Sequence, residues 1–406
     1  MKRYCFTRAL LFFALVLAAG KAAAFDFGLV LSPAGEYASD TAGKGAGFTG
    51  TLAPWFSAAL GDTAGLYLSG KLSFEYEYER QAWAKPFLVE LDRTELSFRP
   101  AQRVSLNLGR QRAGDGGGMI FSGLFDGLSG SFGLGGARLS LGAFYTGFLY
   151  KKTAEILMTA EDRDRYGEAL DYGRLDSYSA SRRVLASAGL EFPDLGSRLS
   201  LALEGLAQFD LNGGGAYHSQ YLEARAGVEA ADALRFTVTG IGALGDQEGE
   251  ALQVQLAAGF GADWDVPGTL KDMVQAELRW GSGAVNSRIG AFRPVNGISQ
   301  GTVFSAALPG LMNARLSYTA RPGENFSFSL GAVCFWRTDR ETFSDTELDG
   351  GSKERYLGTE VSGSLVWAVQ SALRATAGGG AFFPGGAFVE DAKIRWKVNG
   401  GLALSL

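Results

Sequence analysis

The feature that most constrains this chain is an alternation of apolar and polar residues with a period of two. In Lys71–Glu79 (KLSFEYEYE) every second residue is apolar or aromatic, and the residues between them are polar or charged. Such alternation places the two sets on opposite faces of a β-strand. The same pattern recurs in Arg198–Asp210, Asn325–Arg337 and Ala392–Leu406. We therefore expect an all-β protein made of amphipathic strands.

The number and spacing of these segments point to a membrane barrel. About 18 segments follow one another at a mean interval of about 21 residues, which suits the roughly 10-residue tilted strands of such a barrel. Their centres lie near residues 29, 53, 72, 93, 107, 128, 143, 187, 204, 225, 239, 258, 276, 315, 331, 363, 377 and 399.

The connections alternate in length, which adds to this prediction. Turns such as Gly61–Thr63 and Arg321–Gly323 are short, whereas Lys151–Ser177, Gly281–Val303 and Thr338–Arg355 are long and polar. All short turns fall on one side and all long loops on the other, as in outer-membrane barrels. We predict a transmembrane antiparallel β-barrel of about 18 strands (16–18), in preference to a secreted β-sandwich or solenoid.

The N-terminus predicts export. A basic start is followed by the apolar run Ala9–Gly20 and by the small residues Ala22–Ala24, the pattern of a cleaved signal peptide. The apolar run is too short for a spanning helix. We expect residues 1–24 to be removed and residues 25–406 to form the barrel in the cell outer membrane. Outer-membrane lipid and the barrel-assembly machinery are then expected partners.

Composition excludes several classes of protein. The whole chain has a formal net charge of −5, and loss of the four basic residues of the leader, Lys2, Arg3, Arg8 and Lys21, makes it −9. A nucleic-acid partner is therefore not expected. Cys334 is the only cysteine after the leader, so the fold has no internal disulfide. The 58 glycines follow no triplet repeat, which excludes collagen.

Three segments carry a resemblance to a known family. Leu106–Phe132 contains GRQR followed by a return strand FDGLSGSF, Phe292–Tyr318 contains a long loop and a strand, and Leu357–Phe388 holds LGTEVSGSLVWA and GGGAFFPGGAF. Together they resemble alginate-export-type outer-membrane porins. The resemblance implies a monomeric 18-stranded barrel that conducts anionic or polyhydroxylated solutes through an arginine-lined constriction. The chain departs from that pattern in its final residue, Leu406, and in its short loops, so alginate is not assumed as the solute.

Motifs for catalysis and for ligands are weak. Gly297–Gly301 matches G-x-S-x-G, but no helix and no later histidine accompany it, and His218 is the only histidine. We expect no enzyme and no cofactor. Gly114–Gly118 is glycine-rich without the lysine and helix of a phosphate loop, so we interpret it as a flexible loop tip. No metal site is expected; Asp345, Glu347 and Asp349 are a weak calcium candidate without the acid that closes such a loop.

The polar face of the strands carries the functional prediction. Charges facing lipid at mid-membrane cost about 2–4 kcal/mol for Arg or Lys, so the strand charges should face the lumen. A basic wall would concentrate anions, although Arg and Glu on adjacent strands also brace a wall. The predicted pore-lining and selectivity residues are Arg110, Arg112, Arg279, Arg315, Arg374, Arg395, Glu75 and Glu77.

Two functions are compatible with this pattern. The first is a porin for passive diffusion of small hydrophilic solutes, anionic or polyhydroxylated. The second is a barrel plugged by side chains or loops that acts as an adhesin or structural protein through its extracellular loops, mainly Lys151–Ser177. Conductance separates the two functions.

Overall fold

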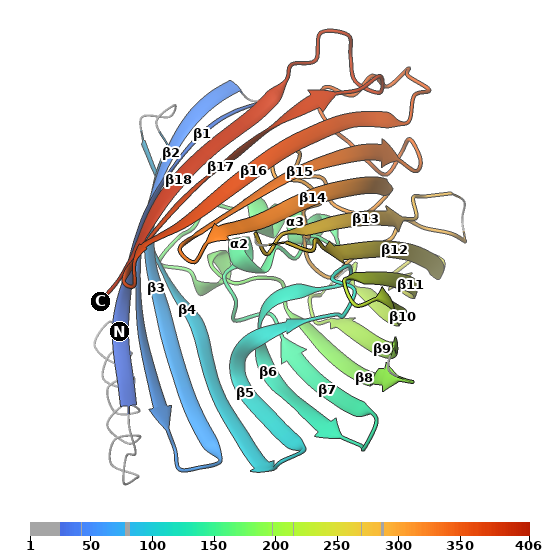
Figure 1. Cartoon of the computed structure of the whole chain (residues 1–406). Coiled ribbons are helices and arrows are strands. Elements are labelled where there is room, and N and C mark those ends of the chain that lie inside the picture. Colours follow the sequence, from blue (N-terminus) through green and yellow to red (C-terminus); the bar gives the residue numbers. More distant parts are fainter. Residues whose placement is uncertain are drawn as a thin grey trace.

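The computed structural model is an 18-stranded antiparallel sheet closed into a barrel (Figure 1). It describes residues 25–41, 43–77, 82–196, 198–213, 215–268, 270–285 and 288–406. The predicted signal peptide, residues 1–24, lies outside the described residues. The strands are β1 (Phe25–Asp40), β2 (Gly43–Ala59), β3 (Ala64–Glu77), β4 (Ala82–Ala101), β5 (Val104–Gly114), β6 (Ser122–Gly133), β7 (Arg138–Tyr145), β8 (Arg183–Leu195), β9 (Leu199–Asp210), β10 (Tyr217–Ala231), β11 (Leu234–Gln247), β12 (Gln253–Asp265), β13 (Met273–Gly281), β14 (Leu311–Gly323), β15 (Phe326–Arg337), β16 (Tyr356–Gln370), β17 (Leu373–Pro384) and β18 (Arg395–Ser405).

Pairing between the two ends of the chain closes the barrel. Each strand pairs with its neighbours in sequence, and β18 pairs with β1, from Val30 opposite Ser405 to Ser39 opposite Trp396. Closure removes the sheet edges, which a membrane does not tolerate. The predicted barrel of about 18 strands is confirmed, and each of the 18 predicted centres lies within a strand.

Alternate residues of the strands face two different environments, the interior of the barrel and its outer surface. On β10, Tyr217, Ser219, Tyr221 and Glu223 are buried inside the barrel, whereas Leu222 between them is exposed. Exposed apolar residues occupy the outer face of most strands, as expected for a surface that meets lipid.

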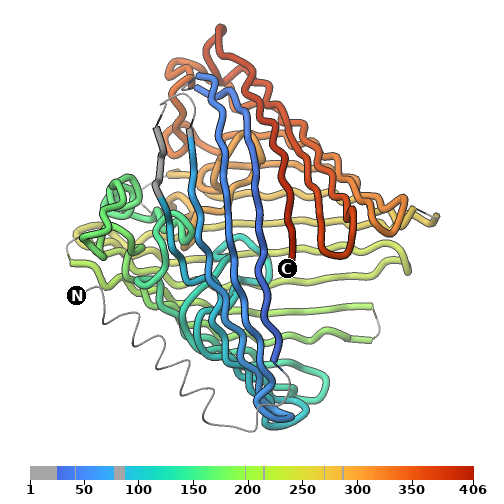
Figure 2. Tube along the Cα trace, turned by 90° about the vertical axis from the view of Figure 1, so that its left-hand side faces the viewer, coloured from blue at the N-terminus to red at the C-terminus, as the bar shows by residue number. Residues whose placement is uncertain are grey.

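The three long loops are present as predicted, and they fold inward. The segment between β7 and β8 contains α2 (Lys151–Ala154), α3 (Ala160–Gly167) and the 3₁₀ turn η1 (Leu175–Ser177), which lie within the ring of strands in Figure 1. In Figure 2 this green segment lies at the opposite end of β8–β12 from their short turns. In the described part of the chain, no helix is long and apolar enough to cross a membrane.

The inserted loops build an apolar core inside the barrel. Phe121, Ile156 and Phe292, one from each of three loops, cluster with inward-facing wall residues such as Leu185 and Tyr221. A second cluster forms around Phe304, Phe335 and Phe382. Hydrophobic burial therefore holds the loops in place, and much of the extracellular half of the lumen is filled.

Candidate functional site

A cavity of about 790 Å³ remains in the lumen beside strands β8–β14. Its walls carry charges of both signs, and the inserted tip of the β5–β6 hairpin bounds it through Gly116, Gly117 and Met119. The charged lining residues are Arg198, Arg225, Arg235, Arg279, Arg315, Glu191, Asp194, Glu229, Asp263 and Glu277. The cavity is thus balanced in charge overall, and the position of its arginines decides what it can bind.

Three arginines gather where the inserted loops meet the cavity. Arg225 donates to the carbonyl of Gly116, Arg279 donates through Nη1 to the carbonyl of Gly118 at 3.2 Å, and Arg315 donates through Nη2 to the carbonyl of Gln300 at 2.6 Å. Arg279 also pairs with Glu277 at 2.7 Å. The same end also carries carboxylates: Glu204 accepts the N–H of Gly116 at 3.2 Å, and Glu277 stands opposite Arg315 in the strand register. This end of the cavity thus combines three guanidinium groups with carboxylates.

The carboxylate of Asp115 holds the tip of the β5–β6 hairpin in a turn. Its carboxylate accepts the backbone N–H groups of Met119 at 2.9 Å, Ile120 at 2.9 Å and Phe121 at 2.7 Å. A Cβ atom at Gly116 would lie 2.4 Å from the Arg225 guanidinium, so a side chain at this position would displace the arginine from the tip. The interpretation of Gly114–Gly118 as a flexible tip was therefore wrong: it is a fixed turn pressed against the opposite wall.

The loop between β13 and β14 is held in a similar way. Glu360, buried on the inner face of β16, accepts the N–H groups of Thr302, Val303 and Phe304 at 2.7, 2.9 and 2.8 Å. The Phe304 ring stacks on Phe382, with centroids 4.2 Å apart and an interplanar angle of 4°. Two carboxylates, those of Asp115 and Glu360, thus each accept three backbone N–H groups of an inserted loop.

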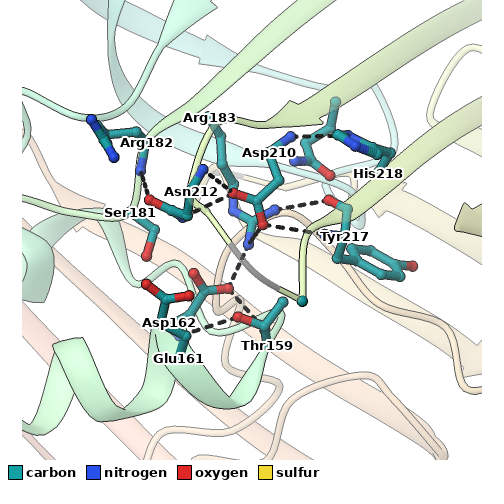
Figure 3. A network of polar contacts seen from close by, with 12 residues as sticks. Thr159, Glu161, Asp162, Ser181, Arg182, Arg183, Asp210, Asn212, Tyr217 and His218 are labelled. Atoms are coloured by element: carbon teal, nitrogen blue, oxygen red, sulfur yellow. Dashed lines mark hydrogen bonds and ion pairs between the residues drawn. The ribbon is translucent and has the colours of Figure 1, made fainter. Parts of the chain in front are cut away.

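A buried ion network fixes the helical loop between β7 and β8 (Figure 3). Arg183 on β8 is fully buried and donates through Nη2 to Asp162 of α3 at 2.6 Å, and the same nitrogen lies 3.0 Å from Asp210 of β9. Its Nη1 donates to the carbonyl of Tyr217 at 3.2 Å. Asp162 also closes the capping box of α3 with Thr159. The loop is therefore attached to three wall strands through one guanidinium.

The structure brings together only some of the predicted site residues. Arg279 and Arg315 line the cavity. Arg374 is exposed close to the short β16–β17 turn, too far along its strand to form a constriction. Arg112 is exposed near the end of β5, Glu75 is half-buried on β3, and the side chain of Glu77 lies outside the described residues.

Arg110 and Arg395 were placed wrongly among the constriction residues. Arg110 pairs in register with Asp126, two positions from the exposed pair of Leu108 and Leu128, so it belongs to the outward-facing set. A one-residue error of this kind moves a side chain to the other face. The Arg110 guanidinium is buried against both Asp126 oxygens, at 2.9 and 2.8 Å.

Arg395 points inward, but the loop between β15 and β16 covers it. Both oxygens of Asp345 accept from Arg395 at 2.7 Å, and Glu347 accepts at 3.0 Å. Two of the three carboxylates of the weak calcium candidate, those of Asp345 and Glu347, are therefore bound to Arg395. In the described ranges, no group of three or more His, Cys, Asp or Glu residues is placed to hold a metal ion.

The contact of Asp345 with Arg395 should break in acid. Burial opposes ionisation of Asp345, but the hydrogen bond from Arg395, the N–H of Glu347 and the charge of Arg395 outweigh it and lower its pKa. Because the pKa of Asp345 is lower in the folded protein than its ordinary value of about 3.9, the contact stabilises the loop fully at pH values above about 3.9. This stabilisation is lost as the pH falls through the lower pKa of the folded state. We expect proteolysis of residues 338–355 to rise below about pH 4. Asp345→Asn should show the faster cleavage already at neutral pH, and equal cleavage of both proteins at every pH would contradict this.

Sequence reasoning missed the residues that hold the loops. Asp115, Asp162, Arg183 and Glu360 are buried. No motif marks Asp115, Arg183 or Glu360, and the spacing of Thr159 and Asp162 indicates only a helix N-terminus. The available signal was a set of apolar runs inside loops, such as Met119–Phe121 and Ile156–Met158, which do not belong on a solvated surface. The G-x-S-x-G match forms no catalytic pair: Ser299 donates to Gly301, and the ring of His218 accepts the N–H of Asp210.

A closed barrel of 18 antiparallel strands with loops folded into a charged lumen is the architecture of outer-membrane porins. Comparison with solved structures agrees. OccK5 (OpdH) of Pseudomonas aeruginosa is similar with a TM-score of 0.60 and 13% sequence identity, over 94% of this chain and 98% of that one. OccK2 (OpdF) of the same organism, in complex with glucuronate, is similar with a TM-score of 0.60 and 15% identity, over the same shares. The outer membrane protein OpdK is similar with a TM-score of 0.59 and 13% identity.

At these identities the likeness shows the fold. It agrees with the 18-stranded barrel that the resemblance implies and does not support the alginate-export type in particular. Neither a protein-family model nor a curated protein matches the chain.

Proposed function

We propose that this protein is an outer-membrane channel that passes small hydrophilic solutes by passive diffusion and prefers anions. The observation that carries the proposal is the cavity of about 790 Å³ inside a closed barrel, with Arg225, Arg279 and Arg315 at its loop-bounded end. Low-dielectric walls focus the field of such charges and raise the local concentration of anions. All three arginines donate to loop carbonyls, and in the described residues Arg225 and Arg315 form no ion pair with a carboxylate, so we infer that their charges act on a solute.

A small carboxylate is the solute class that this site suits best. OccK2, which shares the fold, was solved in complex with glucuronate. A carboxylate accepts two parallel hydrogen bonds from a guanidinium, and the remaining polar groups of the cavity suit hydroxyls. The proposal includes a monomeric barrel in outer-membrane lipid, inserted by the barrel-assembly machinery, without an enzymatic activity or a cofactor.

The alternative of a plugged barrel has an observation in its favour. The core built from Phe121, Ile156 and Phe292 occupies the extracellular half of the lumen. An adhesin or structural role would then act through exposed residues of the loop between β7 and β8, such as Tyr172 and Leu175.

Current through single barrels tests the proposal. The protein is inserted in a planar lipid bilayer with KCl on both sides, and glucuronate is then added. We expect steady unitary currents that glucuronate reduces. A folded barrel that carries no current would contradict the proposal and favour the plugged alternative.

A further inference from the structure

Three acidic side chains and one arginine meet where the tip of the β5–β6 hairpin presses on the wall. Glu223 on β10 stands directly opposite Glu204 on β9 in the strand register. Asp115 of the tip lies within hydrogen-bond range of the Glu223 carboxyl group. Arg225 follows two residues later on the same face of β10. Ionisation of all three acids would therefore set three negative charges against one positive charge.

Glu223 is the member of this group that lacks a donor. Asp115 accepts three N–H groups of the tip, and Glu204 accepts the N–H of Gly116 at 3.2 Å. Arg225 donates to the carbonyl of Gly116. Glu223 is only 1% exposed, and among the described residues its Oε2 atom receives no hydrogen bond. A buried carboxylate without a donor or a cation is costly, so the protonated carboxyl group fits this position better.

Glu223 is in direct contact with the tip. A Cβ atom at Gly117 would lie 2.9 Å from Glu223 Oε2 and 3.0 Å from the methyl group of Thr239. On β11, Thr239 and Ile241 face Glu223 and carry no charge. Tyr221, the preceding inward residue of β10, donates its hydroxyl to a loop carbonyl at 2.5 Å. The charges that face Glu223 thus come from the tip, from β9 and from β10 itself.

The part of the hairpin that carries the tip is free of the wall ladder. In the described residues, β5 pairs with β4 only as far as Arg110, and β6 pairs with β7 only from Asp126 onward. Between these two residues the strands of the hairpin pair with each other alone. A shift of the tip therefore leaves the closed barrel intact.

We propose that Glu223 shares a proton with Asp115, and that this proton keeps the hairpin tip seated in the lumen until alkaline pH removes it to the solvent. A carboxyl group donates to a carboxylate, whereas two carboxylates at this range repel each other. Glu204 and Glu223 are fixed in strand ladders, so the repulsion moves Asp115 and the tip. The inference rests on the proposed function, because the tip regulates passage through the same cavity.

Conductance and amide exchange test the proposal together. Single barrels in a planar bilayer are recorded at about pH 6 and about pH 9, a range that covers the values known for buried glutamates. We expect a several-fold larger unitary conductance at the higher pH. Hydrogen exchange of residues 115–121, followed by mass spectrometry on the folded barrel, reports the position of the tip without any current.

Glu223→Gln is the variant that isolates the proton. Glutamine stays neutral at both pH values and donates to Asp115 through its amide, so the low conductance and the slow exchange should persist at the higher pH. Comparison with the wild type at the same pH removes the chemical effect of pH on exchange. Glu95→Gln is the matched control, because it neutralises a glutamate of β4 that pairs with Arg93 at 2.7 Å, and it should keep the rise of the wild type.

The outcomes separate the switch from the channel. A wild-type conductance that is equal at both pH values, or an equal rise in Glu223→Gln, would overturn the switch and leave the proposed function standing. A barrel without current at either pH would contradict the proposed function, and exchange would then decide: equal exchange of the wild type and Glu223→Gln at the higher pH overturns the switch. If Glu223→Gln does not fold, Asp115→Asn removes the other member of the pair and should also abolish the rise.

Discussion

Replacing Arg183 with alanine is expected to release the helical loop from the lumen and to increase the single-channel conductance. The change leaves the buried carboxylates of Asp162 and Asp210 without their cation. Breaking a buried pair from one side costs about 3–5 kcal/mol. The loop that carries Asp162 reaches water by leaving the lumen, whereas Asp210 remains fixed in a strand ladder. We therefore expect the loop to move and the barrel to stay closed.

Conductance and trypsin cleavage within residues 151–177 measure this release together. Arg174→Ala is the matched control, because it removes an arginine of the same loop whose pairs with Asp176 and Glu168 are exposed. Exposed pairs contribute about 0–1 kcal/mol, so this variant should behave like the wild type. An Arg183→Ala barrel with unchanged conductance and unchanged resistance to trypsin would show that the network does not hold the loop.

Replacing Asp115 with alanine is expected to withdraw the β5–β6 hairpin tip from the cavity. The N–H groups of Met119, Ile120 and Phe121 would lose their acceptor, and each unsatisfied buried donor costs about 1–3 kcal/mol. The tip carbonyls would also leave Arg225 and Arg279. We expect a larger conductance and a stronger anion preference, because the pore widens and two guanidinium groups lose their carbonyl partners.

Two comparisons separate this effect from a simple change of charge. Asp115→Asn keeps one acceptor oxygen and should give an intermediate conductance. Asp232→Ala removes a fully exposed carboxylate at the short turn between β10 and β11 and should leave the conductance unchanged. A lower conductance in Asp115→Ala than in the wild type would contradict the role given to the tip.

The strands were predictable because the two faces of each strand meet different surroundings. Lipid outside favours apolar residues on the outer face of β9, where Leu199, Leu201, Leu203 and Phe209 lie, and the interior accepts Glu204 and Gln208. This constraint acts on every strand separately, so it can be recognised without knowing which strands pair. The alternation of short turns and long loops then predicted which end of the barrel faces the outside of the cell.

The site was less predictable because it depends on how the loops fold. Arg279 and Arg315 follow from strand alternation alone, and both line the cavity. The error at Arg110 was one of face: β5 pairs with β6 in an uninterrupted register, and Arg110 lies two positions from the outward-facing Leu108, so regular alternation places it on the outer face. The error at Arg395 came from a loop contact with Asp345, which is 50 residues away in sequence. A local sequence pattern gives no information about contacts between residues this far apart in the sequence.

The central claim is that arginines at the loop-bounded end of the cavity make the channel prefer anions. The reversal potential across a planar bilayer in a KCl gradient tests this claim most directly, with the wild type compared with the Arg279→Ala, Arg315→Ala double variant. Arg374→Ala serves as the control, since Arg374 is an exposed inward-facing arginine outside the cavity.

We expect the wild type and the control to reverse on the side that indicates chloride preference, and the double variant to move toward zero or to potassium preference. A wild-type channel that prefers potassium, or a double variant with the reversal potential of the wild type, would contradict the account.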